Sequence, residues 1–311
     1  MQQVAMRGKS VSRKRRQNRA TFNRSLATLA QVGIVVKVQN ALSPASPTLV
    51  VEDKHMALVA ETTSVPLTAW PAVSDDSVER FPDRIHEIAE AHQPSRMPFF
   101  RHLAALPKRK ACDPALLGRI YLTYQAAMHA TRAAVYYMPH LDAPALRKRK
   151  LQIYLDDDGL PGGDTHHYQL ARAFRAIGAA LPLEDEEFGD PDELCRHLDR
   201  NTARFVRLSK ELYSRSLGPW CIVEVMSDNW MHALAKALSV HHPKILEAPY
   251  FADCFGQHVE ERHAAEALEV TQMVLRTRPY LLDETVRDAE TMADALDGVW
   301  ERLDAIVRAA E

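Results

Sequence analysis

The chain has 311 residues, of which 46% are apolar, 26% charged and 7% aromatic, and its 39 basic and 41 acidic residues leave a formal net charge of -2. This composition is typical of a globular protein, and the small net charge argues against nucleic acid as the general partner. No run approaches the roughly 18 consecutive apolar residues that a membrane-spanning helix needs, so we expect no association with a membrane.

The start of the chain is basic and contains no acidic residue before position 52. No apolar core of a secretion signal follows the basic residues, because Val32 to Val36 is too short a run. The segment is either an arm that contacts nucleic acid or a solvated, disordered tail, and its composition favours the tail. The basic residues are Arg7, Lys9, Arg13, Lys14, Arg15, Arg16, Arg19 and Arg24.

Four cysteines are widely spaced and form neither a CxxC pair nor a disulfide ladder: Cys112, Cys195, Cys221 and Cys254. We expect reduced and mostly buried thiols, as in a cytoplasmic protein.

Prolines and hydroxyl residues punctuate residues 41–76, with short β-like stretches at 49–51 and 56–59. From Ser77 onward, apolar residues recur at spacings of three and four, which predicts helices. They are expected near 77–92, 96–106, 113–138, 143–157, 164–180, 191–215, 217–240, 248–277 and 284–310, with Asp164 and Asp190 as N-caps. The sequence thus predicts an irregular N-terminal extension over 1–75 and an all-α bundle over 76–311.

Glu260 and His263 stand three residues apart in the predicted helix over 248–277, and therefore on one helical face. A Glu-x-x-His pair within a helix is how bundle proteins offer an oxygen and a nitrogen to one iron or manganese ion. Isolated pairs of this kind also arise by chance on solvated helix faces.

Glu224 lies within the apolar run from Trp220 to Trp230. A carboxylate is expensive to bury without a partner, so Glu224 is either a hydrogen-bonded structural residue or a metal ligand. Asp228, one turn later, is a candidate second ligand or a residue that orients one.

The segment from Tyr154 to His167 contains a run of three aspartates, a glycine-rich turn and a pair of histidines. Adjacent acids repel one another, which is tolerable in water or beside a cation. His166 and His167 point to different faces of the helix that they begin, so we expect at most one of them to bind metal. No P-loop, GxGxxG, GxSxG or HExxH motif is present, which removes the usual support for nucleotide-binding, serine-hydrolase and zincin functions.

Taken in order, these elements resemble the haem-oxygenase-like di-iron oxidases, relatives of pyrroloquinoline-quinone synthase and the thiaminases. The resemblance covers residues 95–280. It rests on PFFRHLAAL (98–106), LQIYLDDDGLPGGDTHH (151–167), AIG (176–178), SLGPWCIVEV (216–225) and the helix that carries Glu260 and His263.

By this resemblance Asp158 takes the place of a ligand Glu, His166 or His167 that of a ligand His, and Glu224 that of the central Glu. The family's last ligand helix reads His-x-x-x-Asp-x-x-His, onto which Glu260 and His263 map. The first His of that motif falls on Gly256, and His258 stands two residues later. Either His258 still reaches the metal through a local distortion of the helix, or the second metal position is weak or lost.

The resemblance implies Fe(II), in two ions, with dioxygen as co-substrate and Glu224 and His263 as the central catalytic residues. The implied reaction is N-oxygenation, oxidative decarboxylation or carbon–carbon cleavage of a small amino-acid-like or acyl substrate, in a homodimer. Candidate pocket walls are Tyr124, Met128, Trp220, Trp230 and Phe255. The alternatives are a metal-independent member of the fold that uses His and Glu as acid and base, and a helical binding protein whose basic arm contacts nucleic acid.

Overall fold

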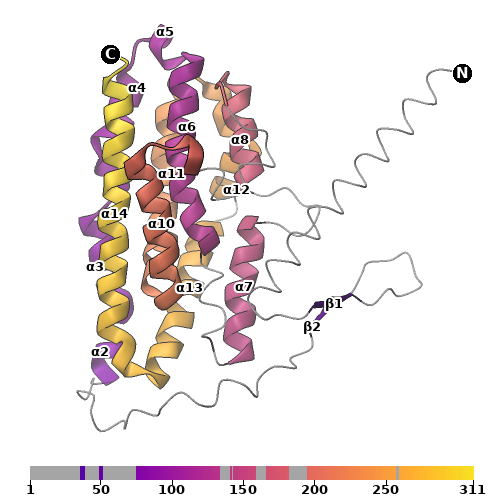
Figure 1. Ribbon diagram of the computed structural model, residues 1–311, viewed down its shortest axis with the longest axis vertical. Helices are drawn as coiled ribbons and strands as arrows, with labels where there is room; N and C mark the ends of the chain where they lie inside the picture. Colours follow the sequence, from indigo (N-terminus) through magenta and orange to yellow (C-terminus); the bar gives the residue numbers. More distant parts are fainter. Residues whose placement is uncertain are drawn as a thin grey trace, which may run out of the picture. The chain divides into compact units, whose positions relative to one another are not determined.

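A computed structural model describes residues 36–38, 49–51, 75–133, 141, 143–158, 166–181, 195–256 and 259–311 (Figure 1). The chain divides into two units, residues 1–70 with 161–163, and residues 71–160 with 164–311. In the first unit β1 (Val36–Val38) pairs antiparallel with β2 (Leu49–Val51), with Lys37 opposite Val50. The β-like stretch predicted at 49–51 is confirmed, whereas that at 56–59 and the basic segment lie outside the described residues.

In the second unit the described residues form helices and turns and contain no strand, which confirms the all-α prediction for this part of the chain. The α-helices are α2 (Asp75–Glu79), α3 (Phe81–Ala91), α4 (Pro98–Ala105), α5 (Lys108–Ala111), α6 (Pro114–Ala133), α7 (Pro144–Asp158), α8 (His166–Ala176), α10 (Arg200–Arg215), α11 (Gly218–Ser239), α12 (Pro249–Gly256), α13 (Val259–Thr277) and α14 (Leu282–Arg308). Short 3₁₀ turns are η2 (Pro94–Arg96), η5 (Pro243–Glu247) and η6 (Pro279–Leu281).

Proline marks the start of α4, α6, α7 and α12, where its missing N–H would have no helical partner in any case. Within the expected helix over 191–215, residues 195–197 are helical, residues 198–199 are not, and α10 begins at Arg200. Asp199 caps it, and one carboxylate oxygen accepts from the backbone N–H groups of Asn201 at 3.0 Å and Thr202 at 3.3 Å. The predicted caps Asp164 and Asp190 lie outside the described residues.

The expected helix over 248–277 is two helices, α12 and α13, which residues 257–258, outside the described part, separate in the chain. The expected helix over 77–92 is likewise two, since α2 ends at Glu79 and α3 begins at Phe81. Apolar periodicity locates both pairs correctly but does not detect the break at Arg80.

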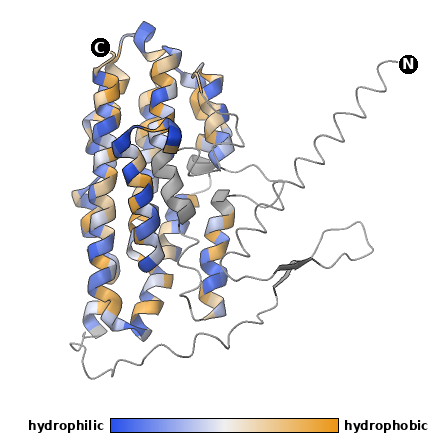
Figure 2. Ribbon diagram, in the orientation of Figure 1, coloured by the Kyte–Doolittle hydropathy of each residue, from blue (hydrophilic) through white to orange (hydrophobic). Residues whose placement is uncertain are grey.

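α11 lies in the middle of the second unit, in contact with α3, α4, α13 and α14 (Figure 1). Residues 218–224 are all buried, as expected for a helix that is apolar on every side. α14 is amphipathic instead, and polar and apolar residues share its length in Figure 2. Its buried stripe includes Val286, Ala289, Met292, Ala293, Leu296, Val299, Trp300 and Leu303.

The first turn of α11 is packed backbone to backbone against α14. A Cβ atom on Gly218 would lie 1.8 Å from the carbonyl oxygen of Thr285, so only glycine fits at this approach. Gly218 therefore sets how closely the two helices meet, and with it the position of the residues that follow on α11.

Among the helices that the structure describes, none is both long enough and apolar enough to cross a bilayer.

Candidate metal centre

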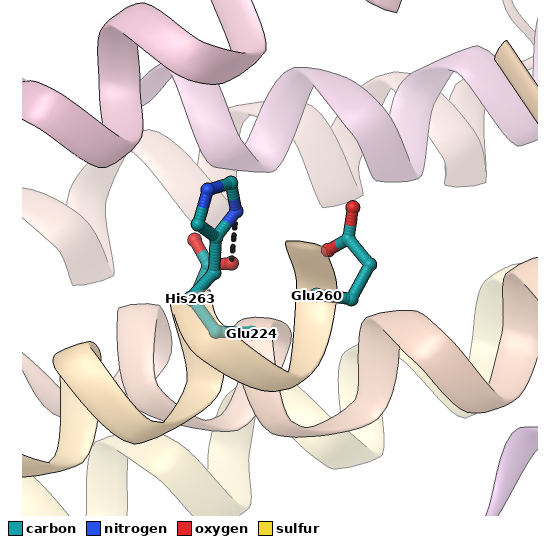
Figure 3. A group of neighbouring side chains, drawn as sticks. All are labelled: Glu224, Glu260 and His263. Atoms are coloured by element: carbon teal, nitrogen blue, oxygen red, sulfur yellow. Dashed lines mark ion pairs between the residues drawn. The ribbon is translucent and has the colours of Figure 1, made fainter. Parts of the chain in front are cut away.

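Three of the candidate ligands meet between α11 and α13, two helices that pack side by side. Glu224 comes from α11, and Glu260 and His263 project from the same side of α13 (Figure 3). Each side chain offers one ligand atom, and these atoms lie within 4.8 Å of one another. All three are buried, with exposed fractions of 3% for Glu224, 5% for Glu260 and 1% for His263.

Glu224 is held from two directions. Trp220, one turn earlier on α11, donates its indole N–H to Oε1 of Glu224 at 2.9 Å. The other oxygen, Oε2, lies 3.9 Å from Nδ1 of His263, the contact dashed in Figure 3. The carboxylate is thus oriented by a neighbour on its own helix, with one oxygen turned toward His263.

Glu260 is oriented by Ser227, a residue of α11. Ser227 Oγ lies 2.7 Å from Oε2 of Glu260 and 2.8 Å from the carbonyl oxygen of Glu224. Since a serine hydroxyl carries a single hydrogen, the two oxygens share one donor. The same short stretch of α11 therefore supplies Glu224 and a hydroxyl that positions Glu260.

Burial, and after it the neighbouring charge of Glu260, raise the pKa of Glu224 to about 8, although Lys150 and the Trp220 hydrogen bond act in the opposite direction. At neutral pH Glu224 therefore retains a proton in much of the population when no cation is present. A divalent cation between the carboxylates would favour the ionised form and release that proton.

Lys150 of α7 lies over the Trp220 ring, with Nζ 3.8 Å from the centre of the indole. The side chain is 1% exposed, and burial lowers the pKa of its ammonium to about 7 despite the attraction of Glu224. Sequence reasoning did not identify this residue. A signal was present, because Lys150 stands at helical spacing between Leu146 and Ile153, both of which face the core.

His166 and His167 lie at the start of α8, and neither belongs to the group of three. The buried ring of His167 accepts a hydrogen bond at Nδ1 from the side-chain amide of Gln125. The His166 ring meets the Tyr250 ring edge-on, with the ring centres 5.8 Å apart. The structure thus places both histidines among residues of α6 and α12.

Asp158 is the last residue of α7 and Gly256 the last of α12, but the Asp158 side chain and all of His258 lie outside the described residues. Asp228 instead approaches His232 one turn along α11, at 3.1 Å, with 42% of its side chain exposed. Asp228 is not among the three residues whose ligand atoms meet, and it is the neighbouring Ser227 that contacts Glu260.

Of the residues expected to line a pocket, some lie near the three candidate ligands and others do not. Trp220 lies at the site, whereas Tyr124 and Trp230 pack around Trp300 in the core, with ring centres 6.2 and 5.8 Å away. The side chains of Met128 and Phe255 lie outside the described residues.

The described cysteines are free thiols, as expected, but only Cys221 is buried, while Cys112 and Cys195 are half-buried. Cys221 follows Trp220 on α11, and its sulfur lies 3.0 Å from the Thr271 hydroxyl. Burial raises the pKa of this thiol to about 12, so it stays protonated and is a poor metal ligand.

No family model matches the sequence, and a search of curated proteins finds no relative.

Proposed function

We propose that Glu224, Glu260 and His263 bind a divalent metal ion, Fe(II), and that the protein is a non-haem iron oxidase or oxygenase. The observation that supports this proposal is the meeting of two carboxylates and an imidazole, all buried, with ligand atoms within 4.8 Å of one another. Two buried like charges are costly to bring together unless a cation or a proton compensates them.

The donor set fits such an ion. Carboxylate oxygens and imidazole nitrogens suit ferrous iron, and three protein ligands leave coordination positions for dioxygen and substrate. When bound, iron supplies the site with the redox chemistry of dioxygen. Trp220 and Ser227 orient the two carboxylates, Glu224 gives up its proton as the cation binds, and the apolar surface of α11 keeps bulk water out.

The finer architecture belongs to the same proposal. A helix with a central Glu beside a helix with Glu-x-x-His is the support for proposing a haem-oxygenase-like bundle. A homodimer and a small amino-acid-like or acyl substrate are the further parts of this proposal. A second ion would need donors beyond the three residues of the site, and Asp158, His166, His167 and His258 remain the candidates. The three ligand atoms that lie within 4.8 Å of one another form a site for one ion.

A second candidate function is metal-independent acid–base catalysis by Glu224 and His263. The observation in its favour is Lys150, a buried cation that offsets part of the negative charge without any metal. A Glu with a pKa of about 8 is also suited to proton transfer near neutral pH.

Anaerobic loading with Fe(II), followed by metal quantitation and an absorbance scan on addition of oxygen, separates these functions. We expect the parent protein to retain iron after loading, and Glu224→Ala and His263→Ala to retain none. Glu261→Gln is a matched control, because Glu261 is exposed on the same turn of α13 as Glu260 and should leave iron binding unchanged. A parent protein that binds no iron would exclude the oxidase and favour the metal-independent function.

A further inference from the structure

Lys150 is a buried cation whose ammonium has no hydrogen-bonding partner. Among the described residues no acceptor lies within hydrogen-bonding distance of Nζ, although the ammonium carries three donors. The Trp220 ring is the surface on which it rests. An indole face attracts a cation, but it does not satisfy N–H donors.

A buried ammonium without an acceptor is unfavourable, and apolar residues of similar size would fill the same space without that penalty. Leu146 and Ile153, on the same face of α7, show that the surroundings accept apolar side chains. The presence of lysine at this position therefore indicates that something else supplies the acceptor.

The balance of charges indicates what kind of group accepts the hydrogen bonds of Lys150. With both carboxylates ionised, Lys150 protonated and a divalent ion bound, the buried groups would carry two negative and three positive charges. The occupied site would hold one excess positive charge in a buried environment, which a single negative charge neutralises. A monoanion fits this balance, whereas a dianion such as phosphate overshoots it.

We propose that Lys150 binds the carboxylate of the substrate, holding it against Trp220 and beside the metal ligand Glu224. This inference rests on the proposed metal site and adds to it the residue that recognises the carboxylate of the substrate. Lysine suits this role because its three N–H donors form charge-assisted hydrogen bonds to carboxylate oxygens.

The test is calorimetric titration of hexanoate, under anaerobic conditions, into the parent protein and into Lys150→Met, each with and without Fe(II). Hexanamide, the uncharged analogue, controls for binding of the alkyl chain. Lys148→Met is the matched variant, because Lys148 is exposed on the same helix. Fatty acids from acetate to decanoate are titrated in the same way, because the length of the substrate's alkyl chain is not known.

We expect hexanoate or another member of the series to bind the iron-loaded parent and Lys148→Met equally. Lys150→Met should weaken that binding by about tenfold or more, since a hydrogen bond to a charged group is lost. Hexanamide should bind the parent and Lys150→Met alike. Equal carboxylate affinity in Lys150→Met, or no carboxylate binding to the iron-loaded parent, would overturn the assignment.

Metal quantitation on the same samples keeps the two proposals apart. Iron bound normally by the parent without carboxylate binding would reject the role of Lys150 alone. Absence of iron from the parent would reject the proposed function, and the titration of metal-free protein would still show whether Lys150 binds the carboxylate. Iron affinity that rises in Lys150→Met, with carboxylate binding unchanged, would show that Lys150 acts as an internal counter-ion instead.

Discussion

Individual side chains at the site are tuned by burial more than by their partners. Glu224 has a pKa raised to about 8 and Lys150 one lowered to about 7, and desolvation is the largest cause in both cases. Each group is therefore driven toward its neutral form, which makes the charge of the site sensitive to pH and to bound ions.

Metal-free protein should lose stability as the pH rises from about 5 to about 8. A Glu whose pKa is higher in the folded state holds its proton there after the unfolded chain has released it, so the folding free energy that protonation contributes disappears through this window. Urea unfolding at pH 5, 6.5 and 8 with a chelator measures the slope.

Glu224→Gln should flatten this slope, because glutamine does not titrate and its oxygen can still accept from Trp220. Glu261→Gln, on the exposed surface of α13, should leave the slope as it is in the parent. A parent protein equally stable at pH 5 and pH 8 would contradict the raised pKa of Glu224.

Replacing Lys150 with methionine should stabilise the metal-free protein at pH 6, by about 1 to 3 kcal/mol. At that pH the lysine is mostly charged and Glu224 mostly protonated, so the ammonium is buried without full compensation. Thermal unfolding of Lys150→Met beside Lys148→Met tests this, and a destabilised Lys150→Met would show that the cation contributes to the fold itself.

At the scale of elements, the site depends on how α11 meets its neighbours. Its first turn touches the backbone of α14 at Gly218, and its later turns present Glu224 and Ser227 to α13. A shift of α11 along or around its axis would therefore move a candidate metal ligand and the hydroxyl that positions Glu260 together.

Gly218→Ala should destabilise the protein by about 3 kcal/mol or more, because the added methyl group would lie 1.8 Å from the Thr285 carbonyl oxygen and force the two helices apart. Gly298→Ala is the control, since a Cβ there meets nothing within 4 Å and alanine favours the helix by about 1 kcal/mol. Urea denaturation of both variants gives the comparison, and equal stability would contradict the close approach of α11 and α14.

For the whole molecule, binding of the proposed metal ion would be linked to folding. The three proposed ligands come from α11 and α13, which η5 and α12 separate in the chain. An ion held between these two helices would therefore favour the folded state over the unfolded chain. Fe(II) added anaerobically should raise the melting temperature of the parent by about 5 °C or more at one hundred times the dissociation constant.

The same addition should leave Glu224→Gln and His263→Ala unchanged, while Glu261→Gln should behave as the parent. Differential scanning fluorimetry with and without a chelator is sufficient. A parent protein whose melting temperature does not respond to Fe(II), Mn(II) or Zn(II) would remove the physical basis for a metal centre.

Helical periodicity determined much of this protein from the sequence alone. The apolar spacing after Ser77 located the helical segments, though not the breaks at Arg80 and before Arg200, and the separation of three placed Glu260 and His263 on one face of α13. Glu224 was identifiable because a carboxylate in an apolar run demands a partner. These are local properties, which neighbouring residues along the chain decide.

The rest was decided by tertiary structure, because it depends on which helices pack together. Only the packing of α11 on α13 brings Glu224 to His263, and only the approach of α7 puts Lys150 on Trp220. Asp228 illustrates the limit, since its spacing on α11 resembles that of a ligand while its side chain pairs with His232 instead. Spacing along the chain identified the helical faces with candidate ligands, whereas the packing of those faces settled which side chains meet, because contacts distant in the chain leave no periodic signal.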